Sequence, residues 1–208
     1  MGSTKTNVRI INMTRLIFAT NNQHKVEEIQ AAIGHLLKVV SLKEAGIEQE
    51  VPEPFETLEE NAREKARVIN RITGENCFSE DTGLEVEALD GAPGVRSARF
   101  AGEDANAEKN TEKLLKEMES TGNRKARFRT VICLKYEGKE YLFEGICEGR
   151  LLAEKRGSLG FGYDPVFVPG GAEKTFAEMN MEEKNRFSHR QKAASQLVLF
   201  LQQQLVKP

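Results

Sequence analysis

The chain has 208 residues, of which 39% are hydrophobic and 30% are charged, a balance that excludes a disordered, collagen-like or disulfide-stapled protein. Its 30 basic and 32 acidic residues give a formal net charge of -2, which disfavours nucleic-acid binding because such binding depends on clustered Lys and Arg. No apolar run approaches the roughly 18 residues of a membrane span. We therefore expect no nucleic-acid partner and no membrane partner.

Residues 1–12 are polar and lack the apolar block of a secretory signal. We treat them as a leader outside the fold and expect residues 13–208 to form a single domain. Cys77, Cys133 and Cys147 each lie in an apolar, strand-like run, and they lack the CxxC spacing of a zinc site. This usage is typical of reduced thiols in a cytoplasmic protein.

The first half of the chain alternates predicted strands and helices. In chain order they are a strand at 15–19, a helix that carries Val26, Ile29, Ile33 and Leu36, a strand at 38–42, an acidic loop at 48–56 and a helix with an apolar stripe at Leu58, Ala62, Ala66 and Ile69. Thr57-Leu58-Glu59-Glu60 has the form of a capping box at the start of that second helix. Residues 77–79 predict a short strand, which the polar residues 80–83 break, and residues 84–89 predict a half-buried strand.

The second half of the chain adds a helix, a hairpin and a terminal helix. Its predicted elements are a loop at 90–102, an amphipathic helix marked by Ala107, Thr111, Leu114, Leu115 and Met118 and closed by Thr121-Gly122, strands at 126–136 and 140–152, a Gly-rich loop at 157–171 and a helix from Ser188 that buries Ala194, Leu197, Val198, Leu201 and Leu205. The connection Glu137-Gly138-Lys139 predicts a hairpin. Interleaved strands and helices followed by a hairpin predict an α/β fold around a mixed sheet.

Two early segments carry residue types suited to chemistry. Thr20-Asn21-Asn22-Gln23-His24-Lys25 lies between a strand and a helix, where free N–H groups, the helix dipole and Lys25 favour an anion, although Thr20 or Asn22 acting only as a helix cap also explains it. Glu80-Asp81-Thr82-Gly83 places two carboxylates at a predicted strand end. These suit Mg²⁺, although a solvated turn fits the pattern too. Adjacent strand residues point to opposite faces, so at most one of the two faces a given cleft. An aspartic protease would need a second Asp-Thr-Gly, and the chain has none.

Two later segments also stand out. In residues 157–165, Phe161 offers a face for a planar base and Asp164 an acceptor for ring N–H groups, although a structural turn is the alternative. Downstream, Lys184 precedes Ser188-His189-Arg190, and the capping-box form of 188–191 places two basic residues in the first turn of a helix. The dipole opposes a cation there, so Arg190 suggests a functional role, with a solvated surface pair as the alternative.

Together and in this order, the four segments resemble the inosine triphosphate pyrophosphatase family, also called the Ham1 or RdgB-type noncanonical purine nucleotide pyrophosphatases. The resemblance runs from about Leu16 to Leu201. Its most specific stretches are Glu80-Asp81-Thr82-Gly83-Leu84, Gly91-Ala92-Pro93-Gly94, Ser97-Ala98-Arg99, Gly160-Phe161-Gly162-Tyr163-Asp164-Pro165 and Ser188-His189-Arg190. It implies an elongated, mixed central β-sheet flanked by helices, in two lobes with a cleft between them. Residues 13–208 would then form one two-lobed pyrophosphatase domain.

The resemblance also implies an activity, namely Mg²⁺-dependent hydrolysis of ITP, dITP and XTP to the monophosphate and pyrophosphate. This is a house-cleaning role in the cytoplasmic nucleotide pool, performed by a homodimer. Asp81 would be the catalytic proton acceptor, and Asp81 and Glu53 would hold the metal, with Glu50 or Glu56 as alternatives to Glu53. The residues that would bind substrate are Thr20, Asn21, Asn22, Gln23, His24, Lys25, Lys65, Thr82, Phe161, Gly162, Tyr163, Asp164, Lys184, His189 and Arg190. Asn21 stands where the family often has Gly. The alternative functions are a Maf-like pyrophosphatase for other modified nucleotides and a noncatalytic nucleotide-binding module.

Overall fold

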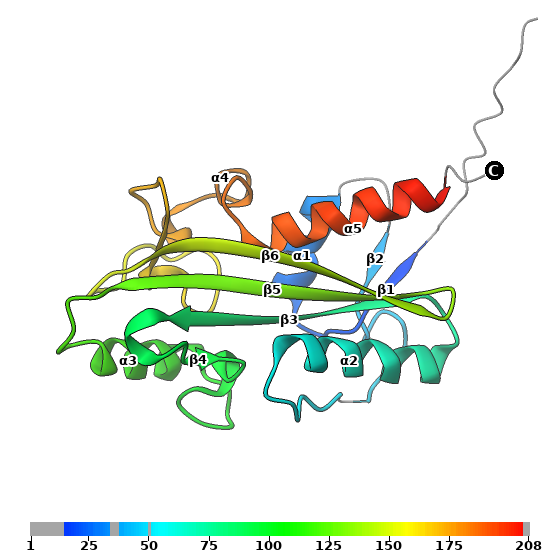
Figure 1. The fold of residues 1–208 in the computed structure, drawn as a ribbon, viewed down its shortest axis with the longest axis horizontal. Coiled ribbons are helices and arrows are strands. Elements are labelled where there is room, and N and C mark those ends of the chain that lie inside the picture. Colours follow the sequence, from blue (N-terminus) through cyan, green and yellow to red (C-terminus); the bar gives the residue numbers. More distant parts are fainter. Residues whose placement is uncertain (1–14, 34–37, 50, 206–208) are drawn as a thin grey trace, which may run out of the picture.

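A long mixed β-sheet lies at the centre of the molecule in a computed structural model, which describes residues 15–33, 38–49 and 51–205 (Figure 1). Within these residues the sheet has seven strands, in the order β2-β1-β3-β5-β6-β7, with β4 paired to β3. They are β1 (Leu16–Phe18), β2 (Val39–Val40), β3 (Cys77–Val86), β4 (Pro93–Gly94), β5 (Lys125–Tyr136), β6 (Lys139–Leu151) and β7 (Phe167–Pro169). β1 runs parallel to β2 and β3, and the remaining pairs are antiparallel. The predicted mixed sheet is confirmed. The predictions for residues 1–12, Leu36 and Glu50 lie outside the described residues.

The central strand β3 corrects the sequence analysis. The predicted break at 80–83 is wrong, because β5 pairs with β3 continuously from Cys77 to Val86. The polar residues stay in the strand because neighbouring elements supply partners for their buried side chains. Gly83 is required here, since a Cβ at this position would lie 2.5 Å from the Gly94 carbonyl oxygen of β4. The strand predicted at 84–89 ends early, and residues 87–89 form a 3-10 turn instead.

Helices cover both faces of the sheet (Figure 1). They are α1 (Gln23–Ile33), α2 (Leu58–Thr73), α3 (Ala107–Glu117), α4 (Met181–Asn185) and α5 (His189–Leu205). α1 and α5 share one face, where Ile29 and Leu197 pack in the same core cluster as Phe18 and Phe78. α2 packs on the other face, where its predicted apolar stripe is buried against Val131. Within the described ranges, no helix is both long and apolar enough to cross a membrane.

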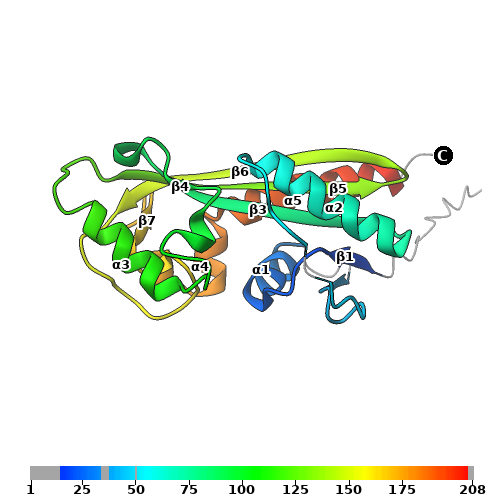
Figure 2. The ribbon, with the colours of Figure 1, turned by 90° about the horizontal axis from the view of Figure 1, so that it is seen from below.

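Two lobes lie at opposite ends of the sheet (Figure 2). The lobe with α1, α2 and α5 has the core just described, whereas the lobe with α3, α4 and β7 has a second core built around Leu114, Phe128 and Phe167. The β5–β6 hairpin spans both lobes. Its predicted turn is confirmed, since Tyr136 pairs with Lys139 and both Glu137 and Gly138 have positive φ, as a type I′ turn requires.

Both predicted capping boxes are present only in part. The Thr57 hydroxyl accepts a bond from the N–H of Glu60 (3.2 Å) and donates to its carboxylate (2.8 Å). The Ser188 hydroxyl accepts from the N–H of Gln191 (3.3 Å), but the Gln191 side chain donates to Ser195 instead of turning back. α3 ends at Glu117, before the predicted Thr121-Gly122 stop. α2 and α5, whose first turns these hydroxyl groups cap, therefore begin where the sequence predicts.

Candidate active site

One edge of β3 is open in the middle of the sheet. On that edge β1 ends at the pair Phe18–Phe78 and β4 begins at the pair Gly94–Leu84. In the described part of the chain, no strand pairs with residues 79–83 on this side. The open edge therefore lets side chains from both faces of the sheet approach Glu80, Asp81 and Thr82 at one place.

Glu80 points toward the face that carries α1 and α5. Its carboxylate accepts bonds from Arg190 Nε (2.7 Å) and Nη2 (2.9 Å) and pairs with Lys25 Nζ at 3.0 Å. Burial alone would raise the pKa of Glu80, but Arg190 and Lys25 outweigh it and hold that pKa well below its usual range. Glu80 is therefore a buried, ionised anchor for two cations.

The ion pairs continue from Arg190 across the buried interior. Arg190 also pairs with Glu28 of α1, which pairs with Lys184 (2.7 Å), and Lys184 pairs with Asp164 (2.6 Å). Arg190 and Glu80 are each 2% exposed. The cation that the helix dipole disfavours at the start of α5 is thus stabilised by buried carboxylates rather than by solvent. We call the set Lys25, Glu80, Arg190, Glu28, Lys184 and Asp164 the buried ion network.

Asp81 points toward the opposite face, under α2, as strand alternation predicts. It accepts a bond from Lys65 Nζ (2.9 Å) and one from Asn61 (3.4 Å). Lys65 also pairs with Glu53, whose second oxygen accepts a bond from Arg99 (3.2 Å). Burial raises the pKa of the Asp81 carboxyl above its usual range, against the pull of Lys65. A carboxylate with a raised pKa is a stronger base toward a bound water than an ordinary surface Asp.

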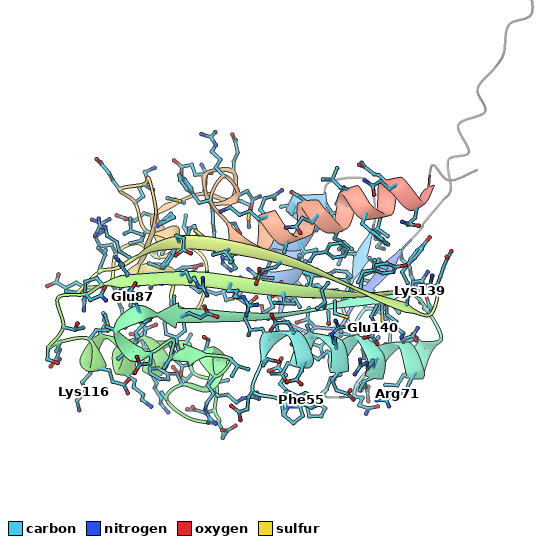
Figure 3. The ribbon with its side chains drawn as sticks, viewed as in Figure 1. Phe55, Arg71, Glu87, Lys116, Lys139 and Glu140 are labelled. Carbon is cyan, nitrogen blue, oxygen red and sulfur yellow. The ribbon has the colours of Figure 1, made fainter. Side chains whose placement is uncertain are left out.

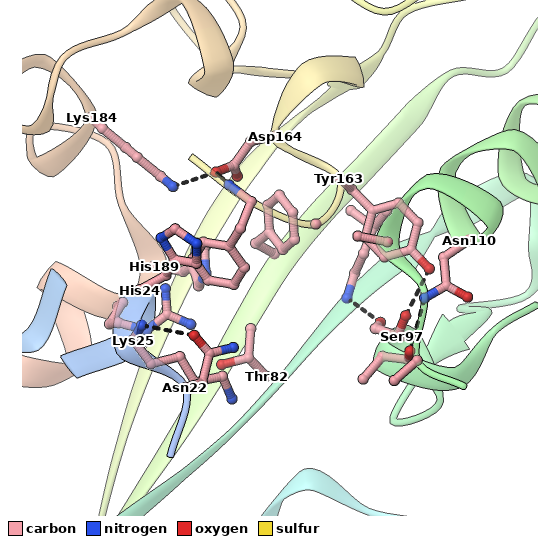
Figure 4. Close-up of a pocket in the computed structure, with 18 residues that line it drawn as sticks. Asn22, His24, Lys25, Thr82, Ser97, Asn110, Tyr163, Asp164, Lys184 and His189 are labelled. Carbon is pink, nitrogen blue, oxygen red and sulfur yellow. Dashed lines mark hydrogen bonds and ion pairs between the residues drawn. The ribbon is translucent and has the colours of Figure 1, made fainter. Parts of the chain in front are cut away.

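A cavity of about 380 Å³ lies between the two lobes on the Glu80 side of the open edge (Figure 4). Its volume falls within the roughly 300–1,000 Å³ typical of small-molecule sites. Its aromatic and charged lining groups come from α1, β5, α4, α5 and the 161–164 loop, and β3 and α3 add polar and apolar side chains. The sequence-predicted residues that it brings together are Asn22, His24, Lys25, Thr82, Phe161, Gly162, Tyr163, Asp164, Lys184, His189 and Arg190.

His189 is the cavity residue with an unsatisfied polar atom. Its ring stacks on Phe128, with centroids 4.7 Å apart and an interplanar angle of 16°. Its Nδ1 is buried and has no hydrogen-bond partner among the described residues. Burial, reinforced by Arg190 and Lys184, lowers the pKa of His189 well below its usual value, so the ring is neutral at neutral pH. An unpaired buried nitrogen costs free energy, and a ligand that fills the cavity could supply its partner.

Phe161 and Asp164 already have partners in this structure. Phe161 stacks with His24, with ring centroids 5.3 Å apart and an interplanar angle of 11°. Asp164 accepts bonds from Lys184 and from the N–H of Phe161 (2.9 Å), and its contact with a base stays a prediction. Gly160 permits this tight loop, because a Cβ there would lie 2.1 Å from an Asp164 carboxylate oxygen.

Thr20 and Asn22 cap the turn that leads into α1, which is the alternative role that the sequence analysis gave for this segment. Thr20 Oγ1 accepts a bond from the N–H of Asn22 (3.1 Å), and Asn22 Oδ1 accepts one from the N–H of Lys25 (3.3 Å). Asn21 accepts a bond from the N–H of Lys43 (2.9 Å), and Gln23 is exposed. Of the six residues, Asn22, His24 and Lys25 line the cavity. Glu53 and Glu56 are the two described candidates for the metal ligand from the acidic loop. Glu53 contacts Lys65, whereas Glu56 is exposed.

Several site residues escaped the sequence analysis. Glu28 lies one turn after Lys25 on α1, and Asn61 lies one turn before Lys65 on α2, so each shares a helix face with a predicted residue. Asn61 and Lys65 also sit beside the apolar stripe of α2, where polar residues are unexpected. Ser97 and Asn110 also line the cavity. Ser97 lies in the Ser97-Ala98-Arg99 stretch that carries the family resemblance, whereas Asn110 carried no comparable local signal.

Comparison with known proteins identifies the family. A model of the Ham1 family matches residues 16–200. The chain belongs to the Ham1 family. It is 47% identical over 184 residues to a dITP/XTP pyrophosphatase of Flavobacterium johnsoniae, covering 88% of this chain and 96% of the relative. It is 51% identical over 190 residues to a dITP/XTP pyrophosphatase of Porphyromonas gingivalis, covering 91% and 98%.

Solved structures of Ham1 proteins share the fold. The Staphylococcus aureus Ham1 protein matches with a TM-score of 0.82 and 35% identity, covering 92% of this chain and all of that structure. A nucleoside-triphosphatase, or dITP/XTP pyrophosphatase, from Mycobacterium abscessus matches with a TM-score of 0.71 and 37% identity, covering 88% and 98%. The predicted fold and family are therefore confirmed.

Glu53 and Asp81 fit a divalent cation. Both carboxylates contact the same Lys65 ammonium, so positive charge already occupies the point on which they converge. Hard carboxylate oxygens are the donors that Mg²⁺ prefers, usually one or two per site with water and phosphate completing the shell. Glu53 and Asp81 would supply two such donors. Among the described residues, there is no group of three or more His, Cys, Asp or Glu that could hold a metal ion.

Proposed function

We propose that this Ham1-family protein hydrolyses the noncanonical purine nucleoside triphosphates dITP, ITP and XTP to the monophosphate and pyrophosphate, and so cleans the nucleotide pool. One observation carries the proposal. A cavity with a buried, unpaired His189 nitrogen adjoins, across the open edge of β3, a basic carboxylate at Asp81. The names of the relatives, dITP/XTP pyrophosphatase, support the same reaction.

The base would lie in the cavity between the lobes. Hypoxanthine and xanthine present an acceptor at position 6, whereas adenine presents an amino donor. Arg190 uses three of its five N–H donors on Glu80 and Glu28, so it retains donors for a substrate, and His189 offers another ring nitrogen. Where a fixed donor faces position 6, adenine leaves two donors opposed, at a cost of about 1–3 kcal/mol per contact, or roughly 5- to 150-fold.

The phosphates would extend along the open edge of β3. Lys25 and Lys65 lie on its two faces and would neutralise phosphate charge, with the 20–25 segment and Thr82 as further contacts. Asp81 would accept the proton of a water that attacks the α-phosphorus, and the α–β bridging oxygen would leave with the pyrophosphate. Glu53 and Asp81 would hold Mg²⁺, which when bound polarises the phosphoryl oxygens and neutralises their charge.

The setting follows from the same resemblance. We infer a homodimer that works in the cytoplasm, where polymerases draw on the nucleotide pool. Sedimentation of the purified protein tests the dimer, and fractionation of cells tests the location.

A substrate panel tests the function. Purified protein with Mg²⁺ is assayed for pyrophosphate release from dITP, ITP, XTP, dATP, GTP, dTTP and UTP. We expect turnover of the first three at rates at least tenfold above the others. Preference for dTTP or UTP would instead support a Maf-like pyrophosphatase, and binding of dITP without release of pyrophosphate would support a binding module.

A further inference from the structure

A second cavity lies on the Asp81 side of the open edge. It measures about 640 Å³ and is lined by residues 51–56 together with Val95, Arg96, Arg99 and Glu103. Phe55, which contributes to its wall, lies on the α2 side of the sheet (Figure 3). Glu53, one of the two proposed metal ligands, lies in its wall.

A single turn connects the two cavities. Ser97 and Ala98 of the 3-10 turn η2 (Ser97–Arg99) line the cavity assigned to the base, and Arg99 lines the second one. Lys25 and Thr82 lie in the first cavity at the open edge of β3. A nucleotide whose base occupies the first cavity and whose phosphates follow this edge therefore points its terminal phosphates toward Arg99.

Arg99 has a carboxylate partner that it shares. Its Nη2 lies 3.2 Å from one oxygen of Glu53, while the other oxygen of Glu53 pairs with Lys65, which in turn pairs with Asp81 at 2.9 Å. Two cations thus share one carboxylate at the end of the predicted phosphate path. The Arg99 side chain is 37% exposed, so it is accessible to a ligand. Guanidinium groups bind phosphate oxygens in a bidentate manner, which an ammonium group cannot do.

The backbone around Arg99 is fixed on both sides. The Ser97 hydroxyl accepts a bond from a β3 N–H (2.8 Å), and buried Asn110 of α3 donates to the carbonyl of Ala98 (2.8 Å) and accepts from the N–H of Ala101 (2.6 Å). Bonds from two different elements hold the turn that presents Arg99. The backbone that carries Arg99 is therefore fixed before a ligand arrives and Glu53 orients the guanidinium, which reduces the entropy lost on binding.

We propose that the second cavity is a pyrophosphate subsite, in which Arg99 binds the β- and γ-phosphoryl groups of the substrate and then the leaving pyrophosphate. The described lining carries Glu53, Glu56 and Glu103 against Arg96 and Arg99. The ligand is therefore pyrophosphate accompanied by a divalent cation rather than the free anion. This inference rests on the proposed function, because it assigns the leaving group of that reaction.

Calorimetric titration with two probes tests the subsite. Pyrophosphate and dIMP are each titrated, in the presence of Mg²⁺, into the wild type and the R99Q, R99K and R71Q variants. Arg71 is the matched control: its side chain is 69% exposed, it pairs with Glu64 at 3.1 Å, and it lines neither of the two cavities. Circular dichroism melts establish that each variant is folded.

We expect R99Q to weaken pyrophosphate binding at least about tenfold, as loss of a charge-assisted contact implies, and R99K to restore only part of it. The dIMP affinity of R99Q, and both affinities of R71Q, should stay within about twofold of the wild type. Unchanged pyrophosphate affinity in R99Q, equal weakening of both probes, or no pyrophosphate binding by the wild type would each overturn the subsite. The proposed function fails separately, if the wild type releases no pyrophosphate from dITP, ITP or XTP.

Discussion

Glu80 and Asp81 are adjacent carboxylates on β3, and their substitution by the neutral amide should affect different properties. We expect Asp81→Asn to lower the turnover rate and Glu80→Gln to lower the melting temperature. Asp81→Asn removes the proposed proton acceptor but leaves Lys65 paired with Glu53. General-base contributions are typically about 10²- to 10⁴-fold, so kcat should fall by that factor. The affinity for dITP should change by less than about fivefold, because both lysines that we propose to bind phosphate remain.

Glu80→Gln removes the shared partner of Arg190 and Lys25 in a site that is 2% exposed. Removing one partner of a buried ion pair costs about 3–5 kcal/mol. For a chain of this size, each kcal/mol shifts the melting temperature by about 2–4 °C, so the expected drop is about 6–20 °C.

Two assays on the same preparations separate these effects: pyrophosphate release from dITP, and thermal unfolding followed by circular dichroism. Asp81→Asn should melt within about 5 °C of the wild type, in contrast to Glu80→Gln. A full rate for Asp81→Asn would show that another group accepts the proton. A wild-type melting temperature for Glu80→Gln would show that the buried ion network does not stabilise the fold.

Three further predictions follow from the site and the sheet. The pKa values of Glu80 and Glu28 are lowered in the folded state. The stability that their ionised forms contribute is therefore complete above about pH 4.3, the usual pKa of Glu, and is lost as the pH falls toward the folded-state pKa values. Urea unfolding between pH 6 and pH 3 should show this decline in the free energy of unfolding. His189→Phe keeps the stack on Phe128 but removes the polar nitrogens, so the ratio of kcat/KM for dITP over dATP should fall about 5- to 150-fold; an unchanged ratio would rule out His189 as a base-reading group. Gly83→Ala places a Cβ 2.5 Å from the Gly94 carbonyl oxygen and should lower the unfolding free energy by about 1–3 kcal/mol in urea melts.

Local signals predicted the elements whose cause is local. The Glu137-Gly138 turn was predictable because Gly138 accepts the positive φ that such a turn requires. The start of α2 was predictable because Thr57 satisfies a free N–H within the next turn. The motif around Asp81 was predictable from its resemblance to a known family, which the match over residues 16–200 confirms.

The continuity of β3 was not predictable from local signals. Four consecutive polar or small residues resemble a turn when they are read alone. Their strand conformation depends on β5, about fifty residues later, and their burial depends on cations from α1, α2 and α5. Glu28 and Arg190 lie 162 positions apart in the chain, so no window of sequence contains both partners of that ion pair.

The buried ion network is better explained by the site than by stability. Replacing buried ion pairs with well-packed apolar residues is often neutral or stabilising, so fold stability alone gives no reason to bury Arg190 and Lys184 and to hold the half-buried Lys25 on Glu80. All three line the cavity between the lobes, and each is fixed by a carboxylate that solvent scarcely reaches. Hydrogen-bond donors in fixed positions around the unpaired His189 nitrogen can discriminate between bases, because they cannot reorient to pair with a mismatched base. Under the proposed function, the buried ion network would hold these donors in fixed positions, so that they select between purine bases.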